Sequence, residues 1–400
     1  MKSSKGVFYM TNLNSFVISK RSKETPPSGI RKIFNKAMFL EDVIHLEIGE
    51  PDFDTPQHIK EAGCKAILSK YTHYTHNAGL LELREAIADY YRSTQNVDVS
   101  LENTLVSIGG TGALLLSLLA VVDIGDEVLL PNPGYPPYTS MLKMIGAIPK
   151  YYSLKENESF LPNIEEIESI ITNNTKAIII NTPNNPTGIV YPPNILRRIS
   201  ELAKDHGLVV ISDEVYERLI FDNLNHYSIL KFSEEGNVIV IGSFSKSYAM
   251  TGWRVGFAVS NNVEIIKSMT ELQEHVAICA PAMAQKAAFV ALTKSQEEAE
   301  NMVKQYEKRR NLVVSLLNEL PNVSFVKPQG AFYLFLNISH YSKDSYRFAE
   351  ELLLKKKVAV APGATFGSLG EGYVRISFAN SEENIQKGIK QVKEFLRELK

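Results

Sequence analysis

The segment SFSKSYAMTGWRVGF, residues 243–257, places a lysine, hydroxyl residues and an arginine directly after an apolar run. An amine such as that of Lys246 attacks an aldehyde only when it is neutral, so a partly buried lysine is suited to forming a Schiff base. Ser243 and Arg254 supply a hydroxyl and a guanidinium, which together suit a dianionic phosphate. The segment therefore indicates a site for a phosphorylated aldehyde, and a solvated surface lysine is the alternative.

A second anion site is indicated by VSIGGTGALLLSLLAVV, residues 106–122, where Gly109, Gly110 and Thr111 precede an apolar helix. Small residues let backbone N–H groups at a helix N-terminus approach an anion closely. No GK[ST] sequence follows, and Leu115 occupies the place of the third glycine in GxGxxG, so neither nucleotide-binding motif is present. A tight turn into a helix is the alternative interpretation.

Two polar side chains follow apolar runs that have the character of strands. Asn185, in NTPNNPTG, can donate a hydrogen bond to a phenolate or carbonyl oxygen, and an Asn-Pro turn is the alternative. Asp213, in VVISDEVYERL, ends an apolar run, so its carboxylate needs a cation such as a protonated pyridine nitrogen. Tyr216 is close enough in sequence to reach an oxygen of the same ring. The alternative for Asp213 is an N-cap on a following helix.

Arg375 is the one charge in the apolar run GYVRISFA, and its planar guanidinium is suited to a carboxylate. An arginine on an edge strand that pairs with a surface acid is the alternative. His73 and His76 form an HxxH pair without a third ligand or HExxH motif, so we expect no metal site. There is no GxSxG motif.

The elements that must position these residues follow from the hydrophobic pattern. Continuous apolar runs predict strands covered on both faces at 126–133, 176–186, 207–214 and 237–245. Helical patterns lie between them, at 112–122 and 193–206, which indicates a parallel or mixed sheet flanked by helices. Such sheets bind ligands at the carboxyl ends of their strands. A C-terminal α+β part is predicted with helices at 297–320 and 382–399 and strands at 330–338, 357–363 and 372–379.

The totals fit a globular protein. The 400 residues are 44% hydrophobic and carry a net charge of −2, so nothing indicates a nucleic-acid-binding or membrane surface. Cys64 and Cys279 are far apart, which argues against a disulfide framework and fits a reducing cytoplasm. There is no secretory signal and no apolar run of about 20 residues. We therefore expect a soluble, cytoplasmic protein, in which Met10 is an alternative start.

As a set, these motifs resemble the pyridoxal-phosphate-dependent aminotransferases of fold type I, in the class I/II group that includes archaeal and bacterial aspartate and aromatic aminotransferases. The resemblance covers roughly residues 28–398, and the motifs stand in the family's order. They are IGEPDFDTP, YTHNAGLLELREAI, GGTGA, PNPGYPPY, NTPNNPTG, SDEVY, SFSKSYAMTGWRVGF, GAFY and GYVRISFA.

The resemblance implies an α/β fold with a mostly parallel seven-stranded sheet and a smaller α+β domain. It places the large cofactor-binding domain at residues 49–296 and the small domain at 1–48 with 297–400. It implies pyridoxal 5′-phosphate as cofactor, L-amino acids and 2-oxo acids as substrates, and ping-pong kinetics. It also implies a homodimer.

For the ring of the cofactor, the resemblance implies three catalytic residues. Lys246 would form the Schiff base and carry the proton from the substrate. Asp213 would pair with the pyridinium nitrogen, and Tyr216 together with Asn185 would bind the phenolate oxygen. Tyr135 would stack on the ring.

For the phosphate, the resemblance implies Gly110, Thr111, Ser243 and Arg254 as ligands. Tyr74 corresponds to the family's tyrosine that reaches the phosphate in the neighbouring subunit. The shared site is therefore expected to need two copies of the chain.

For the substrate, the resemblance implies that Arg375 and the backbone at Gly49 take the α-carboxylate, assisted by Asn185. Some bacterial aspartate aminotransferases have a lysine for the distal carboxylate where this chain has Thr111, and residues 271–281 contain no arginine. A broad pocket for aspartate, aromatic or similar amino acids is therefore predicted, with glutamate and 2-oxoglutarate as the common pair.

Three other functions are compatible with parts of this pattern. Another enzyme with the same cofactor and fold, such as a C–S lyase or an aminocyclopropane-carboxylate synthase, would share nearly all the cofactor residues. A non-catalytic regulatory module that binds pyridoxal phosphate would need a DNA-binding segment, for which the chain has no spare length. An NAD-dependent oxidoreductase would need the missing GxGxxG motif.

Overall fold

The computed structural model describes residues 18–25, 28–233 and 237–399, so the tail before residue 18, with Met10, lies outside the described residues. Within these residues the largest element is a seven-stranded sheet in the order β2-β8-β7-β6-β5-β3-β4. Its strands are β2 (Thr104–Ser107), β3 (Glu127–Asn132), β4 (Ile148–Ser153), β5 (Thr175–Asn181), β6 (Val209–Asp213), β7 (Val238–Ser243) and β8 (Gly256–Ser260).

Neighbouring strands of this sheet are parallel except at β8, which runs antiparallel to both β2 and β7. The predicted mostly parallel sheet is therefore confirmed. The strand predicted at 176–186 ends earlier, at Asn181, because Pro183 and Pro186 have no N–H to give to a neighbouring strand.

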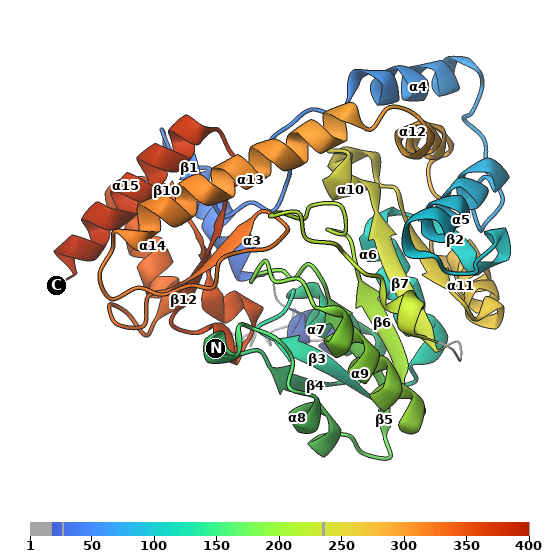
Figure 1. Cartoon of the computed structure of the whole chain (residues 1–400), viewed down its shortest axis with the longest axis horizontal. Helices are drawn as coiled ribbons and strands as arrows, with labels where there is room; N and C mark the ends of the chain where they lie inside the picture. Colours follow the sequence, from blue (N-terminus) through green and yellow to red (C-terminus); the bar gives the residue numbers. More distant parts are fainter. Residues whose placement is uncertain (1–17, 26–27, 234–236, 400) are drawn as a thin grey trace, which may run out of the picture.

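Helices cover both faces of the sheet and pack on the smaller sheet as well (Figure 1). Their bounds are α2 (Lys20–Glu24), α3 (Gly29–Ala37), α4 (Gln57–Leu68), α5 (Leu81–Gln95), α6 (Gly109–Val121), α7 (Pro137–Ile145), α8 (Ile164–Ser169), α9 (Pro193–Asp205), α10 (Phe244–Ser247), α11 (Val263–Val276), α12 (Ala282–Thr293), α13 (Glu297–Asn318), α14 (Ser345–Lys356) and α15 (Glu382–Glu398). The helix predicted at 112–122 starts earlier, because the glycines form its first turn.

The central strands are apolar along most of their length because successive side chains enter different cores. In β6, Ile211 packs in a cluster with α6 and α11, whereas Val210 packs in the cluster on the other face. Both side chains are fully buried. This burial on two faces explains why the strands read as continuous apolar runs rather than as alternating ones.

A smaller unit is built around the three-stranded sheet β11-β12-β9, with β12 (Tyr373–Ser377) in the middle, between β11 (Ala361–Pro362) and β9 (Tyr333–Asn337). A separate parallel pair joins β1 (Ile44–His45) to β10 (Val358–Ala359). The N-terminal segment therefore contributes to the C-terminal unit. Helices α13 and α15 pack against each other on this unit (Figure 1).

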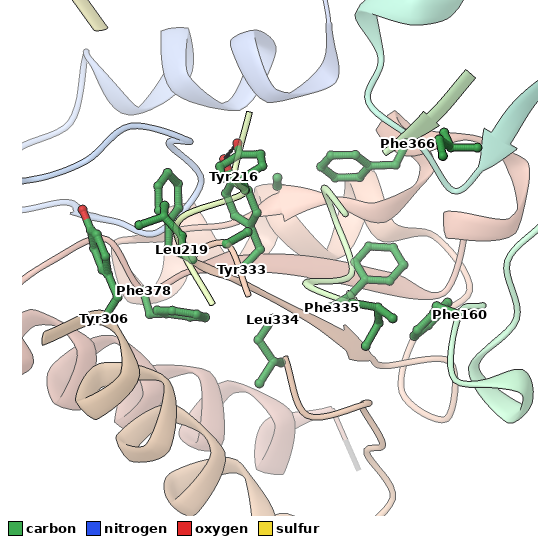
Figure 2. Packing of buried hydrophobic residues seen from close by; sticks show 14 of the residues in the cluster. Phe160, Tyr216, Leu219, Tyr306, Tyr333, Leu334, Phe335, Phe366 and Phe378 are labelled. Carbon is green, nitrogen blue, oxygen red and sulfur yellow. Dashed lines mark hydrogen bonds between the residues drawn. The ribbon is translucent and has the colours of Figure 1, made fainter. Parts of the chain in front are cut away.

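Aromatic side chains fill the space between the small sheet and the strand ends of the large one (Figure 2). Phe335 lies 6.0 Å, centroid to centroid, from both Phe160 and Phe366. Tyr216 meets Tyr333 edge to face at 5.8 Å. These contacts fix the small sheet beside the carboxyl ends of β5 and β6. Among the described residues, no helix combines the length and apolar character required to cross a membrane.

Candidate active site

A cavity of about 680 Å³ lies where the strands of the large sheet end. Asn181, Asp213 and Ser243 are the last residues of β5, β6 and β7, and all three line the cavity, as expected for an open α/β sheet. The predicted site residues that line it are Gly49, Gly110, Thr111, Tyr135, Asn185, Asp213, Tyr216, Ser243, Lys246, Arg254 and Arg375. Residues that were dispersed along the chain thus share one cavity.

Lys246 lies in α10, the short helix that follows β7. Ser243 caps this helix, because its side chain accepts a hydrogen bond from Ser245 N at 3.2 Å. Lys246 Nζ donates to the carbonyl oxygen of Gly49 at 2.6 Å. Burial lowers the pKa of Lys246 from 10.5 to about 8, with Arg375 adding to the shift and Glu50 opposing it. The alternative of a solvated surface lysine is therefore wrong.

Asp213 is 6% exposed at the end of β6. Its Oδ2 accepts a hydrogen bond of 2.6 Å from the hydroxyl of Tyr138, and its Oδ1 accepts one of 3.3 Å from Val215 N. Burial raises the pKa of Asp213 to about 6, although the Tyr138 hydrogen bond lowers it. A turn follows β6, so the alternative of a helix N-cap is wrong.

The anion end of the cavity is formed by the first turn of α6 and by Arg254. A Cβ added at Gly109, which has φ +68°, would lie 2.6 Å from Nη2 of Arg254. A Cβ added at Gly110 would lie 3.4 Å from Cβ of Ser243. Glycine at position 109 therefore lets the helix N-terminus and the guanidinium come together, and the Ser243 side chain lies beside Gly110. Thr111 is exposed and lines the same end.

Arg375 is 2% exposed in β12, the middle strand of the small sheet, so the edge-strand alternative is wrong. Its Nη1 donates to Oδ1 of Asn185 at 2.9 Å, and its Nη2 donates to the carbonyl oxygen of Glu47 at 2.5 Å. Its guanidinium lies 4.1 Å from the ring centroid of Tyr333. Nε has no hydrogen-bond partner among the described residues. A buried cation with an unpaired donor is suited to an anionic ligand.

The Tyr216 hydroxyl lies 2.8 Å from that of Tyr333 (Figure 2). Burial raises the pKa of Tyr216 well above its usual value, so the hydroxyl is a neutral donor at pH 7. The backbone of Asn185 is held in place by Asn181, because the N–H of Asn185 donates a hydrogen bond to Oδ1 of Asn181 at 2.7 Å. Tyr135 packs edge to face on Tyr138 at 5.4 Å.

Tyr74 is the one predicted site residue that does not line the cavity; its side chain is 78% exposed. His76, two residues further on, is used locally, because its Nδ1 accepts a hydrogen bond from Ala78 N.

Sequence reasoning missed Tyr138, Asn181 and Tyr333, which contact the predicted residues. Tyr138 and Tyr333 lie in the quoted motifs PNPGYPPY and GAFY, so the motifs themselves were the available signal. It also missed Arg31 and its neighbours on α3, which line the cavity from the N-terminal segment.

The sequence matches the family model for aminotransferase class I and II over residues 41–392, so the chain belongs to that family. Members of this family use pyridoxal phosphate, and the chain is a pyridoxal-phosphate-dependent aminotransferase.

Named relatives agree with this assignment. The aspartate aminotransferase of Pyrococcus horikoshii is 40% identical over 97% of this chain and 99% of its own. The aromatic-amino-acid aminotransferase 2 of Thermococcus litoralis is 39% identical over 96% of this chain and 99% of its own. The structure of aspartate aminotransferase from Thermus thermophilus with maleate superimposes with a TM-score of 0.89, at 36% identity over 94% of this chain and 99% of that one.

Proposed function

We propose that this aminotransferase moves the amino group of dicarboxylic and aromatic L-amino acids to 2-oxo acids, with 2-oxoglutarate as the common acceptor and ping-pong kinetics. The observation that carries the proposal is that Arg375 and Lys246 share one cavity: a buried guanidinium with an unpaired Nε beside a lysine of lowered pKa. Relatives named as aspartate and aromatic aminotransferases support both substrate classes.

The cavity fits pyridoxal phosphate by the chemistry of its donors. We propose that Lys246 binds the aldehyde as a Schiff base and that Asp213 pairs with the protonated ring nitrogen. Tyr216 and Asn185 suit the phenolate oxygen, because one is a neutral donor and the other can donate through its amide nitrogen. Tyr135 is proposed as the ring's stacking partner.

The phosphate is proposed to bind at the first turn of α6. Gly110 and Thr111 offer backbone N–H groups there, and the dipole of a 13-residue helix favours an anion. Ser243 and Arg254 add a hydroxyl and a guanidinium from the segment around Lys246.

The substrate α-carboxylate is proposed to bind at Arg375, assisted by Asn185 and the backbone at Gly49. A side chain at position 49 would collide with the Tyr333 hydroxyl, so the backbone runs close to the carboxylate site only because the residue is glycine. Stacking on Tyr333 holds the guanidinium plane in one orientation.

When bound, the cofactor supplies an electron sink for the bonds at the substrate Cα. The protein's own contribution is to orient and to move protons. Arg375 orients the carboxylate, and Asp213 holds its negative charge at the ring nitrogen. Burial lowers the pKa of the Lys246 amine, which favours its neutral form and suits it to accept the Cα proton and return it.

We propose that two copies of the chain share their active sites. Tyr74 is 78% exposed, and exposed apolar side chains, including Ile67 and Leu68 at the end of α4, lie nearby in sequence. Exposed apolar groups of this kind are typical of a subunit interface. Tyr74 is therefore proposed to reach the phosphate of the partner's site.

We propose the domain boundaries of the sequence interpretation, with residues 49–296 as the large domain and 1–48 with 297–400 as the small one. The pairing of β1 with β10 supports this for the described residues. A cytoplasmic location is also proposed, because neither Cys64 nor Cys279 forms a disulfide.

The test is a panel of amino donors with the purified protein and pyridoxal phosphate. We expect a visible absorption band that borohydride fixes to Lys246, and conversion of that band by glutamate, aspartate and phenylalanine in the absence of any acceptor. The Lys246→Ala variant should show neither the borohydride-fixed absorption band nor its conversion by amino acids. Release of ammonia and pyruvate without a need for a 2-oxo acid would contradict the proposal and would favour a lyase.

A further inference from the structure

Arg31 lies on the face of α3 that borders the cavity. The helix buries Gly29, Ile33 and Ala37 on one side, at a spacing of four residues, whereas Arg31 and Phe34 line the cavity. The Arg31 guanidinium lies 5.2 Å from the centroid of the Phe34 ring. The N-terminal segment thus brings a cation to the edge of the substrate space.

The other charged residues that line the cavity already have protein partners. Lys246 donates to Gly49, Asp213 accepts from Tyr138, and Arg375 donates to Asn185 and Glu47. Arg254 donates to the carbonyl oxygen of Thr251, whose hydroxyl in turn donates to Glu50.

Arg31 differs from this group. Across residues 18–25, 28–233 and 237–399, its guanidinium has no acid or carbonyl partner, and the Phe34 ring is its contact. A cation that borders a ligand cavity and stays unpaired is available to an anionic group of the ligand.

Apolar groups make up much of the rest of the cavity lining, namely Ile30, Phe34, Ile48, Leu114, the ring of Tyr135 and two prolines, while Ser28 and Glu50 are polar residues of the same lining. An apolar wall accepts an aromatic or aliphatic side chain, but it offers no partner to a second carboxylate. A dicarboxylic substrate therefore needs a cation from elsewhere, and Thr111 at the anion end carries no charge.

We propose that Arg31 binds the distal carboxylate of dicarboxylic amino acids and 2-oxo acids, while the apolar wall beside it takes aromatic side chains. This inference rests on the proposed function, because it names the substrate side chain that the same site recognises. One cation at the end of an apolar wall explains how a single pocket serves both substrate classes: the guanidinium pairs with a carboxylate or packs flat against a ring.

Arg31 is exposed to solvent, and the packing of α3 fixes its backbone at the edge of the cavity. A Cβ at Gly29 would collide with the side chains of Tyr346 and Thr365, so the helix is closely packed on the small unit. The side chain of Ser28 caps the helix by accepting a hydrogen bond from Arg31 N at 3.3 Å.

The test compares two inert ligands of equal length, glutarate and pentanoate, which differ by one carboxylate. Isothermal titration calorimetry on the protein loaded with pyridoxal phosphate should show glutarate binding at least about tenfold more tightly than pentanoate, as a charge-assisted pair predicts. In Arg31→Met this preference should disappear while pentanoate binding is retained. Lys32→Met, which removes a cation from the same helix away from the cavity, should keep the preference.

Kinetics give a second readout. In Arg31→Met the KM for glutamate and 2-oxoglutarate should rise about tenfold, while kcat/KM for phenylalanine stays within about threefold. A variant that keeps the glutarate preference, or that loses both ligands equally, would overturn the assignment. If no amino acid converts the cofactor, the proposed function fails, yet the ratio of the two dissociation constants still decides the role of Arg31.

Discussion

The hydroxyl of Tyr138 donates a hydrogen bond of 2.6 Å to Oδ2 of Asp213, 75 residues further along the chain. Both side chains are buried, so the interaction takes place away from water. It lowers the pKa of Asp213 against the opposing effect of burial. Tyr138 thus helps to keep a carboxylate charged at a place where a buried acid would otherwise hold its proton.

Tyr138→Phe should reduce activity through Asp213. Loss of the hydrogen bond leaves the buried Asp213 carboxylate with one donor fewer when the charge is needed, so we expect kcat to fall by about tenfold. Because the lost interaction lowers the pKa of Asp213, that pKa should rise, and the acid limb of the pH dependence of kcat/KM should move to higher pH. Steady-state kinetics between pH 5 and 9 measure both effects.

Tyr152→Phe is the control for this change. Tyr152 is also buried, and its hydroxyl donates to the carbonyl oxygen of Ile179 at 2.9 Å, outside the cavity. It should lose about 1 kcal/mol of unfolding free energy and keep the pH profile. Equal profiles for the two variants would contradict the role given to Tyr138.

Gly109→Ala should weaken cofactor binding by about tenfold or more. The new methyl group would lie 2.6 Å from Nη2 of Arg254 and would push the guanidinium away from the anion end. Gly207→Ala is a matched control, because Gly207 has φ +65° and nothing within 4 Å of an added Cβ. Both variants carry the same backbone strain of about 1 kcal/mol. The difference between their dissociation constants for pyridoxal phosphate, measured by equilibrium dialysis, therefore reports the effect of the contact with Arg254. Equal dissociation constants would refute the prediction.

Arg375→Lys should raise KM for both the amino acid and the 2-oxo acid by about 10- to 100-fold, because an ammonium cannot form the bidentate pair or stack on Tyr333. The cofactor absorption band should be unchanged. Arg347→Ala, an exposed change on α14, serves as the control and should leave KM at the parent value. Loss of the cofactor from the Arg375 variant would show that this residue had been misplaced.

Cofactor attachment should depend on pH with a break near 8. Below about pH 8 the Lys246 amine of the cofactor-free protein is protonated and cannot attack an aldehyde, so the rate should rise about tenfold per pH unit and then level off. Stopped-flow absorbance after mixing with pyridoxal phosphate measures this rate. Glu50 raises the pKa of Lys246, so Glu50→Gln should move the break to lower pH. A rate that still rises at pH 10 would rule out the lowered pKa.

The strands that sequence patterns predict best are those buried on both faces. The apolar runs before Asn132, Asn181, Asp213 and Ser243 are β3, β5, β6 and β7. By contrast, β8 follows directly on the segment around Lys246 and was not predicted. It runs antiparallel between β7, which precedes it closely in the chain, and β2, which lies far earlier, and the pairing with β2 leaves no local pattern.

The same distinction applies to the site. Residues such as Lys246 and Asp213 are recognisable because their types are unusual next to apolar strands. Tyr333 lies in the GAFY motif, but an aromatic residue in a strand is ordinary, so its contact with Arg375 becomes visible when β12 places the guanidinium against its ring. Arg31 is a common type on an exposed helix, so its position at the cavity follows only from how α3 docks.

The parallel pairing of Ile44–His45 with Val358–Ala359 sets an order of assembly during synthesis. All seven strands of the large sheet have been synthesised by residue 260, whereas the partners of β1 and α3 are synthesised much later. The nascent protein can therefore form its cofactor platform before the surface on which α3 docks, and with it Arg31, has been synthesised. The part of the site that would bind the substrate side chain is complete only after the C-terminal strands have been synthesised.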